Sequence, residues 1–225
     1  ATAVSLSCMF SDLTQKSYSD EKFRARENLL DVLVRAGVKV AWIDNNTGDQ
    51  GIAKRTGSER IAVDTTLAAC AKGECTDAVY LDILRDKLAS ITEDTVLVFH
   101  MIGSHGPAYF MRYPDEFRRF TPDCQTANFN ECTAEEITNA YDNTLLFTDH
   151  IIAETARMMA AQDRVVPAQL FLSDHGESLG EGGLFLHGAP RFMAPETQYK
   201  VPMNIWLSPE FERMTGITHE CLAAQ

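Results

Sequence analysis

The chain has 225 residues and a mass of 25.0 kDa, with 45% hydrophobic and 23% charged residues. This is the composition of one globular domain, and it excludes a disordered chain, a coiled coil and a small disulfide scaffold. Asp and Glu outnumber Lys and Arg by 32 to 20, which gives a net charge of −12. Because such a surface repels phosphate backbones, we expect no nucleic-acid partner.

Apolar residues recur alternately with helical and strand spacing along the chain. The pattern predicts helices over residues 19–36, 76–88 and 133–162, and strands over residues 38–43, 95–99, 170–172 and 201–207. Thr76 and Thr133 are the predicted N-caps, and Pro202 marks an edge strand or a strand start. Trp42 and Trp206 are expected in the core. The alternation predicts an α/β fold whose mainly parallel sheet is sandwiched by helices.

The cysteine spacing points to an oxidising compartment. The sequence contains six cysteines: Cys8, Cys70, Cys75, Cys124, Cys132 and Cys221. Two pairs, Cys70–Cys75 and Cys124–Cys132, enclose short polar segments that disulfide bonds could close. The alternatives are free thiols and a zinc knuckle, although no CxxC motif or neighbouring histidine supports the latter.

Polar residues gather where the predicted strands end, which is where ligands bind in open α/β sheets. They are Asp44, Asn45, Asn46, His100, His105, Asp174, His175 and Glu177. At a strand end that turns into a glycine-containing loop, Asp174 and His175 can both point at one ion. A carboxylate with an imidazole suits Zn²⁺. The alternative is a polar loop in which Asp174 forms a turn.

Two further histidines, His105 and His187, lie in loops next to glycines. Glycine neighbours expose an imidazole and let the backbone approach a ligand. The alternative for each is a histidine on a surface loop. The repeated pattern favours a clustered site.

Six segments together give the sequence a specific resemblance. They are residues 2–11, 44–46, 105–109, 139–143, 174–181 and 186–188. In this order they resemble conserved segments of the lipid A phosphoethanolamine transferases, the family that includes the mobile colistin-resistance enzymes. The resemblance implies an alkaline phosphatase/sulfatase-like fold for a single catalytic domain over residues 1–225. It also implies that this domain is truncated at both ends and that the membrane domain is absent from the chain.

The resemblance assigns the nucleophile and the metal ligands. Thr2 corresponds to the threonine that attacks the donor phosphate and carries the covalent phosphoethanolamine, its hydroxyl activated by Zn²⁺. Thr2, Asp174 and His175 correspond to three zinc ligands, and the family's fourth ligand is a glutamate upstream of residue 1. The other interpretation of Thr2 is a frayed terminal residue.

The resemblance also implies a substrate-binding set. Asn46, His105, Glu177 and His187 correspond to residues that contact the phosphoethanolamine group or stabilise its phosphoryl oxygens. Glu177 would alternatively bind a second zinc. Gln50 stands where some members carry lysine, so contacts there are expected to differ.

Family members pair cysteines locally, which supports the bonds Cys70–Cys75 and Cys124–Cys132. Cys8 resembles a cysteine whose partner precedes the nucleophile, and Cys221 has no counterpart. Tyr109 is expected in an aromatic, basic loop that faces lipid.

The function implied by the resemblance is transfer of phosphoethanolamine from phosphatidylethanolamine to a lipid A phosphate. It would proceed through a phospho-threonine intermediate on the periplasmic face of the Gram-negative inner membrane and contribute to polymyxin resistance. The alternatives are a sulfatase-like hydrolase, a phosphoethanolamine transferase with another glycan acceptor, and a catalytically incomplete zinc-binding fragment.

Overall fold

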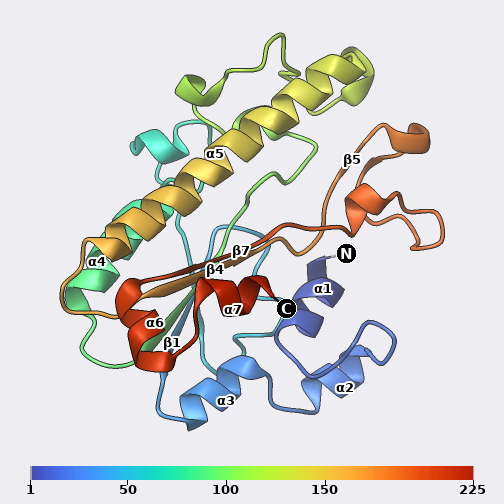
Figure 1. The fold of residues 1–225 in the computed structure, drawn as a ribbon. Coiled ribbons are helices and arrows are strands. Elements are labelled where there is room, and N and C mark those ends of the chain that lie inside the picture. Colours follow the sequence, from blue (N-terminus) through green and yellow to red (C-terminus); the bar gives the residue numbers. More distant parts are fainter. Residues whose placement is uncertain (1, 225) are drawn as a thin grey trace.

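The computed structural model describes residues 2–224, in which strands lie between two groups of helices (Figure 1). The strands are β1 Lys39–Asp44, β2 Ser58–Arg60, β3 Thr95–His100, β4 Ala168–Leu172, β5 Ser178–Leu179, β6 Phe185–Leu186 and β7 Met203–Leu207. The α-helices are α1 Thr2–Met9, α2 Asp20–Arg24, α3 Leu29–Arg35, α4 Val79–Ser90, α5 Ala134–Ala160, α6 Pro209–Thr215 and α7 His219–Ala223. In Figure 1, α4 and α5 lie on one side of the strands and α1–α3 on the other, as the α/β prediction requires.

The strands form one parallel sheet and two antiparallel pairs. The parallel sheet has the order β2-β1-β3, so Asp44 at the end of β1 is level with Arg60 on one side and His100 on the other. Strand β7 pairs antiparallel with β4, and β5 pairs antiparallel with β6. The prediction of a mainly parallel sheet is therefore right for β1 and β3 and wrong for β7. The chain returns from β4 to β7 through the β5–β6 hairpin rather than a crossover helix, and such a return gives an antiparallel pair.

Side-chain hydrogen bonds hold the long helices on the sheets. The Tyr80 hydroxyl of α4 donates to the carbonyls of Ile43 and His100, at 3.1 and 2.8 Å, and so fixes α4 against the ends of β1 and β3. On α5, the Thr155 hydroxyl lies 2.8 Å from Oε1 of Gln169 in β4. The Tyr80 bonds fix the ends of β1 and β3, from which site loops extend, and the Thr155 bond fixes the start of β4.

Three helix starts test the predicted caps. The helix expected over residues 19–36 is divided into α2 and α3, because the Asn28 side chain caps α3 in a capping box with Asp31. Thr76 does not cap α4, whose N-cap is Ala78 without a side-chain bond. Thr133 does cap α5, through a reciprocal pair with Glu136, and this prediction is confirmed.

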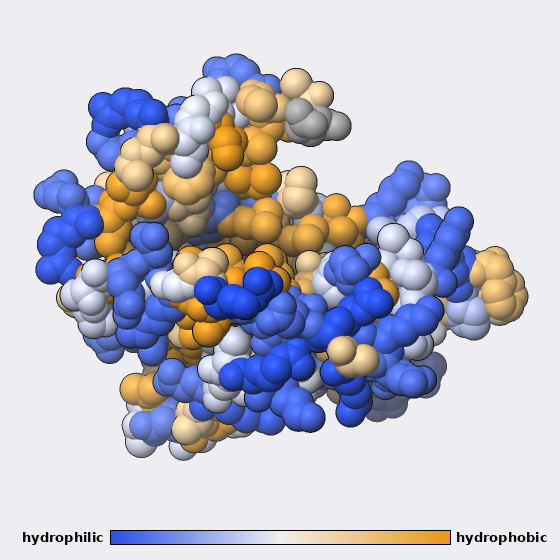
Figure 2. All heavy atoms as spheres, turned by 90° about the horizontal axis from the view of Figure 1, so that it is seen from below, coloured by the Kyte–Doolittle hydropathy of each residue, from blue (hydrophilic) through white to orange (hydrophobic). Residues whose placement is uncertain are grey.

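The core is best developed beneath the parallel sheet. Trp42 is 1% exposed and packs in a cluster that includes Leu6 and Leu30. Trp206, by contrast, is only partly buried, because the two-stranded β4–β7 sheet offers it fewer neighbours than a larger sheet would. Leu170 of β4 is strongly exposed, and Figure 2 shows apolar residues in a band across the hollowed face seen there.

The structure confirms both predicted disulfides, Cys70–Cys75 and Cys124–Cys132. Cys8 is a half-buried free thiol and Cys221 an exposed one. Within residues 2–224, no helix combines the length and the hydropathy that a membrane crossing needs.

Asp31 and Arg55 form an ion pair that should make stability depend on pH. The hydrogen bond from the Arg55 guanidinium, 2.7 Å long, holds the pKa of the Asp31 carboxyl below its usual range. A carboxyl whose pKa is lower in the folded state stabilises the protein above its unfolded pKa of about 3.9. That contribution is lost as the pH falls from there through the folded-state pKa. We therefore expect Asp31→Asn to destabilise the protein at pH 7, and the difference from wild type to shrink below about pH 4. Urea unfolding at pH 7 and below about pH 4 measures the difference in free energy of unfolding between Asp31→Asn and wild type. The same difference at both pH values would contradict the prediction. Asp12→Asn, in an exposed pair with Arg26, is the control.

Candidate active site

The structure brings Thr2 together with the predicted Asp174–His175 pair across almost the whole length of the chain. Thr2 is the first residue of α1 and is partly buried. Its Oγ1 lies 3.0 Å from Nε2 of His175, in the loop that follows β4. A carboxylate oxygen of Asp174 lies 3.4 Å from the same nitrogen.

The two distances to His175 are compatible with a zinc ligand set. Ligands of a tetrahedral Zn²⁺, each about 2.0–2.1 Å from the ion, lie about 3.3 Å from one another. The distances from His175 Nε2 to Thr2 and Asp174, 3.0 and 3.4 Å, match that edge length. A hydroxyl, a carboxylate and an imidazole are also donors that zinc accepts. The residues present therefore fit the metal.

The three histidines of the site are oriented in the same manner. Nδ1 of His105 and Nδ1 of His175 each lie within hydrogen-bond distance of the carbonyl of the next residue, at 2.8 and 3.1 Å. Nδ1 of His187 lies 2.8 Å from Oε1 of Glu177. A carbonyl only accepts, so Nδ1 of His105 and of His175 carries a proton, and in the neutral ring Nε2 presents a lone pair. With that neutral ring, the Thr2 hydroxyl donates to His175 Nε2.

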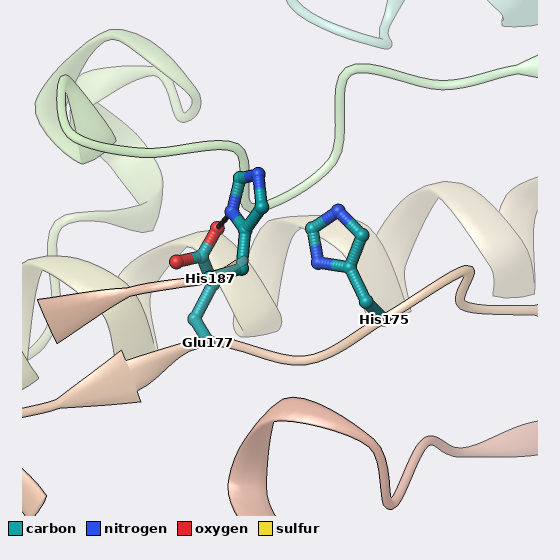
Figure 3. Close-up of side chains that lie close together, drawn as sticks. All are labelled: His175, Glu177 and His187. Atoms are coloured by element: carbon teal, nitrogen blue, oxygen red, sulfur yellow. Dashed lines mark hydrogen bonds and ion pairs between the residues drawn. The ribbon is translucent and has the colours of Figure 1, made fainter. Parts of the chain in front are cut away.

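Glu177 and His187 form a second group beside His175 (Figure 3). One ligand atom from each of the three residues lies within 4.8 Å of the others, and the two imidazole rings are 4.0 Å apart at their centroids. Burial raises the pKa of the Glu177 carboxyl and lowers the pKa of His187. Both directions disfavour charge, so His187 is held as a neutral imidazole at pH 7. This group would suit a second metal ion or a cationic substrate group.

Asn46 and His105 lie to one side of this cluster. The His105 ring is 5.6 Å from the His187 ring. The Asn46 amide donates to the carbonyl of Met101 at 2.8 Å, and both Asn46 and His105 line a cavity at the ends of the parallel strands. Gln50 takes a left-handed backbone conformation, and its amide donates to the Thr47 carbonyl at 3.3 Å.

Sequence reasoning missed the role of Tyr109. The residue was expected in a lipid-facing loop, but it is 1% exposed. Its hydroxyl donates to Oε2 of Glu177 at 3.4 Å, on the side opposite His187. Burial in a cluster with Ile137 and Ala140 overrides the loop character of its sequence neighbours. Tyr109 therefore helps to orient Glu177.

A buried arginine holds the His105 loop in place. Arg112 donates through Nε to the His105 carbonyl at 3.0 Å, and its side chain is 7% exposed. It also pairs with Glu74, inside the Cys70–Cys75 loop. Lys72 from that loop donates to the Phe110 carbonyl at 2.9 Å. The disulfide-closed loop thus supports the segment that carries His105. No local sequence signal indicated this supporting role.

Glu74→Gln is expected to loosen this support, because it leaves the Arg112 guanidinium without its carboxylate. We expect a stability loss of about 1–2 kcal/mol and a change in the ring ¹⁵N signals of His105. Thermal unfolding and histidine NMR measure the two effects. Glu59→Gln, which removes an exposed partner of Lys87, is the matched control and should change neither. Unchanged His105 signals in Glu74→Gln would refute the support role.

Comparison with known proteins places this geometry in a family. The sequence profile described as Sulfatase matches residues 1–222. The chain belongs to the sulfatase family. The fold prediction is thereby confirmed.

Relatives within the sulfatase family narrow the resemblance. The chain is 41% identical over 226 residues to phosphoethanolamine transferase EptA of Escherichia coli K12, covering 100% of this chain and 41% of that protein. It is 38% identical to phosphatidylethanolamine transferase Mcr-1 of Escherichia coli, covering 97% of this chain and 41% of that protein. The chain thus spans less than half the length of these curated relatives.

A solved structure agrees with these similarities. The soluble domain of lipooligosaccharide phosphoethanolamine transferase A from Neisseria meningitidis matches with a TM-score of 0.92 and 40% identity. The match covers 100% of this chain and 67% of that one. Together with the sequence relatives, it confirms the resemblance to the phosphoethanolamine transferases.

Proposed function

We propose that the protein transfers phosphoethanolamine from phosphatidylethanolamine to a lipid A phosphate, through a covalent intermediate on Thr2. The observation that carries this proposal is the 3.0 Å contact between the Thr2 hydroxyl and Nε2 of His175. The similarity to EptA, named a phosphoethanolamine transferase, and to Mcr-1, named a phosphatidylethanolamine transferase, supports phosphoethanolamine as the transferred group.

The reaction has two displacements. In the first, Thr2 Oγ1 forms a bond to the donor phosphorus and loses its proton, while the bond from phosphorus to the diacylglycerol oxygen breaks and that oxygen takes up a proton. In the second, a phosphate oxygen of the acceptor attacks the same phosphorus and the bond to Thr2 breaks; the Thr2 oxygen takes up a proton from the acceptor phosphate or from water, which restores the free hydroxyl. A phosphate linked to a threonine separates one difficult transfer into two easier ones.

Thr2, Asp174 and His175 would hold Zn²⁺. When bound, the ion lowers the pKa of the Thr2 hydroxyl and offsets negative charge on the phosphoryl group.

The neighbouring residues would bind and orient the substrate. His105 and His187 would face the phosphoryl oxygens through Nε2, because Nδ1 of each is already directed at an oxygen, and each would donate to them once Nε2 has taken up a proton. Glu177 would hold either the ethanolamine ammonium or a second zinc. Asn46 would contact the substrate from the edge of the cavity.

The compartment follows from the same proposal. The two disulfides require an oxidising environment, and the relative from Neisseria meningitidis is a soluble domain of a larger transferase. We place this domain on the periplasmic face of the Gram-negative inner membrane, with a membrane domain outside residues 1–225 and a role in polymyxin resistance.

The test measures both halves of the reaction in the full-length protein. A fluorescent phosphatidylethanolamine should yield diacylglycerol, and mass spectrometry should show lipid A heavier by one phosphoethanolamine group. Loss of both on chelation and recovery with zinc would support the metal assignment. Release of free ethanolamine phosphate without any modified lipid would instead identify a hydrolase, and modification of another glycan would change the acceptor.

A further inference from the structure

A cavity of about 310 Å³ lies beside the catalytic cluster, beyond the carboxyl ends of β1, β2 and β3. Its walls include Asn46, Thr47, Arg60, Glu74, His105 and Arg112. The volume is within the range of small-molecule sites. His105 belongs to both places, since it lines the cavity and its ring faces His187. A ligand in the cavity would therefore adjoin the site of phosphoryl transfer.

The charged groups of the cavity are paired, with one exception. The Asp44 carboxylate lies 2.6 Å from Nδ1 of His100, and Glu74 pairs with Arg112. Arg60 forms no ion pair among the described residues. Its guanidinium makes a single long contact of 3.5 Å with the Asn46 carbonyl, which places it at the end of β1. Arg60 is thus the charged side chain of the cavity that no ion pair within residues 2–224 engages.

The remaining walls are suited to a sugar. Ile61, Val63 and Ile102 supply apolar surface, while Thr47 supplies a hydroxyl. Apolar faces with hydroxyls at their edges are the chemistry of a pyranose ring.

We propose that this cavity binds a sugar phosphate monoester, with Arg60 binding the phosphate and the apolar wall contacting the ring. Arg is the side chain best matched to phosphate oxygens, which its planar guanidinium engages in pairs. In the context of the proposed function, on which this role rests, the ligand is the phosphorylated sugar end of the acceptor. Arg60 then determines acceptor affinity and takes no part in the attack by Thr2.

Binding is tested on the metal-free chain, without turnover. Calorimetric titration compares three ligands: glucosamine 1-phosphate as the sugar phosphate, glucosamine as the same sugar without phosphate, and glycerophosphoethanolamine as the donor headgroup. We expect the sugar phosphate to bind most tightly, and Arg60→Gln to weaken it at least about tenfold, as loss of a charge-assisted hydrogen bond should. Arg60→Lys should recover part of that loss. Arg85→Gln, which removes an exposed arginine on α4, is the control and should change nothing.

Two results would overturn the proposal: a dissociation constant for glucosamine 1-phosphate that Arg60→Gln leaves unchanged, or tighter binding of glycerophosphoethanolamine, which would make this the donor's subsite.

Kinetics in the full-length protein separate this inference from the proposed function. Transfer to lipid A with an unchanged acceptor KM in Arg60→Gln would refute the subsite and leave the function. Arg60-dependent binding without any transfer would refute the function and leave the subsite.

Discussion

Thr2→Ala is expected to reduce phosphoethanolamine transfer at least about a thousandfold, because it removes the only oxygen that the 3.0 Å contact with His175 positions for attack. Incubation with donor alone should leave wild-type protein heavier by one phosphoethanolamine group and the variant unmodified. Intact-protein mass spectrometry measures this, and peptide mapping should place the added mass on Thr2.

Thr2→Ser is the informative companion, since it keeps the oxygen and should retain both the adduct and measurable turnover. Thr14→Ala makes the same change at an exposed threonine and should match wild type. Transfer that persists in Thr2→Ala, or an adduct on another residue, would exclude Thr2 as the nucleophile.

Asp77→Ala is expected to cause the largest stability loss, about 3–5 kcal/mol, because three donors lose a shared buried acceptor. Asp77 is 3% exposed. It accepts hydrogen bonds from the Asn45 amide at 2.9 Å, from the Ile102 N–H at 3.0 Å and from the Gly103 N–H at 2.8 Å. These bonds join the ends of β1 and β3, so activity should fall as well.

Urea unfolding measures the effect of Asp77→Ala. Asp77→Asn should lose less, because its remaining oxygen still accepts. Asp82→Ala, at an exposed carboxylate on α4, should stay within about 0.5 kcal/mol of wild type. A loss below about 1 kcal/mol in Asp77→Ala would show that the donors find other partners.

Local signals predicted the parts of the fold that local interactions determine. The start of α5 was predicted because Thr133 and Glu136 cap it within four residues of sequence. The division between α2 and α3 depends in part on the Asn28 amide, which donates to the Ile52 carbonyl at 2.7 Å across 24 positions. No periodicity within residues 19–36 contains that contact.

Strand β2 was missed for a similar reason. Its residues, Ser58–Arg60, are polar and exposed, and only pairing with β1 makes them a strand. By contrast, β1 and β3 have apolar runs that identify them directly. The same limit applies to β7, whose position was predicted and whose direction was not.

The candidate site shows the same division. Strand ends followed by polar residues located Asp174 and His175 without further information. The approach of Thr2 to His175 spans 173 positions and was expected only from the family resemblance. Tyr109 and Arg112 gain their roles from tertiary contacts with Glu177 and Glu74, for which the sequence holds no spacing signal.

The oxygen atoms that orient the rings of His105, His175 and His187 differ in whether a substitution can remove them. The oxygens that face Nδ1 of His105 and His175 belong to the main chain, so replacement of a side chain cannot delete them. The oxygen that faces His187 belongs to Glu177, and a single codon change can remove it. Substitution of Glu177 during genetic drift can therefore change the orientation of the His187 ring, while the main chain still orients the rings of His105 and His175.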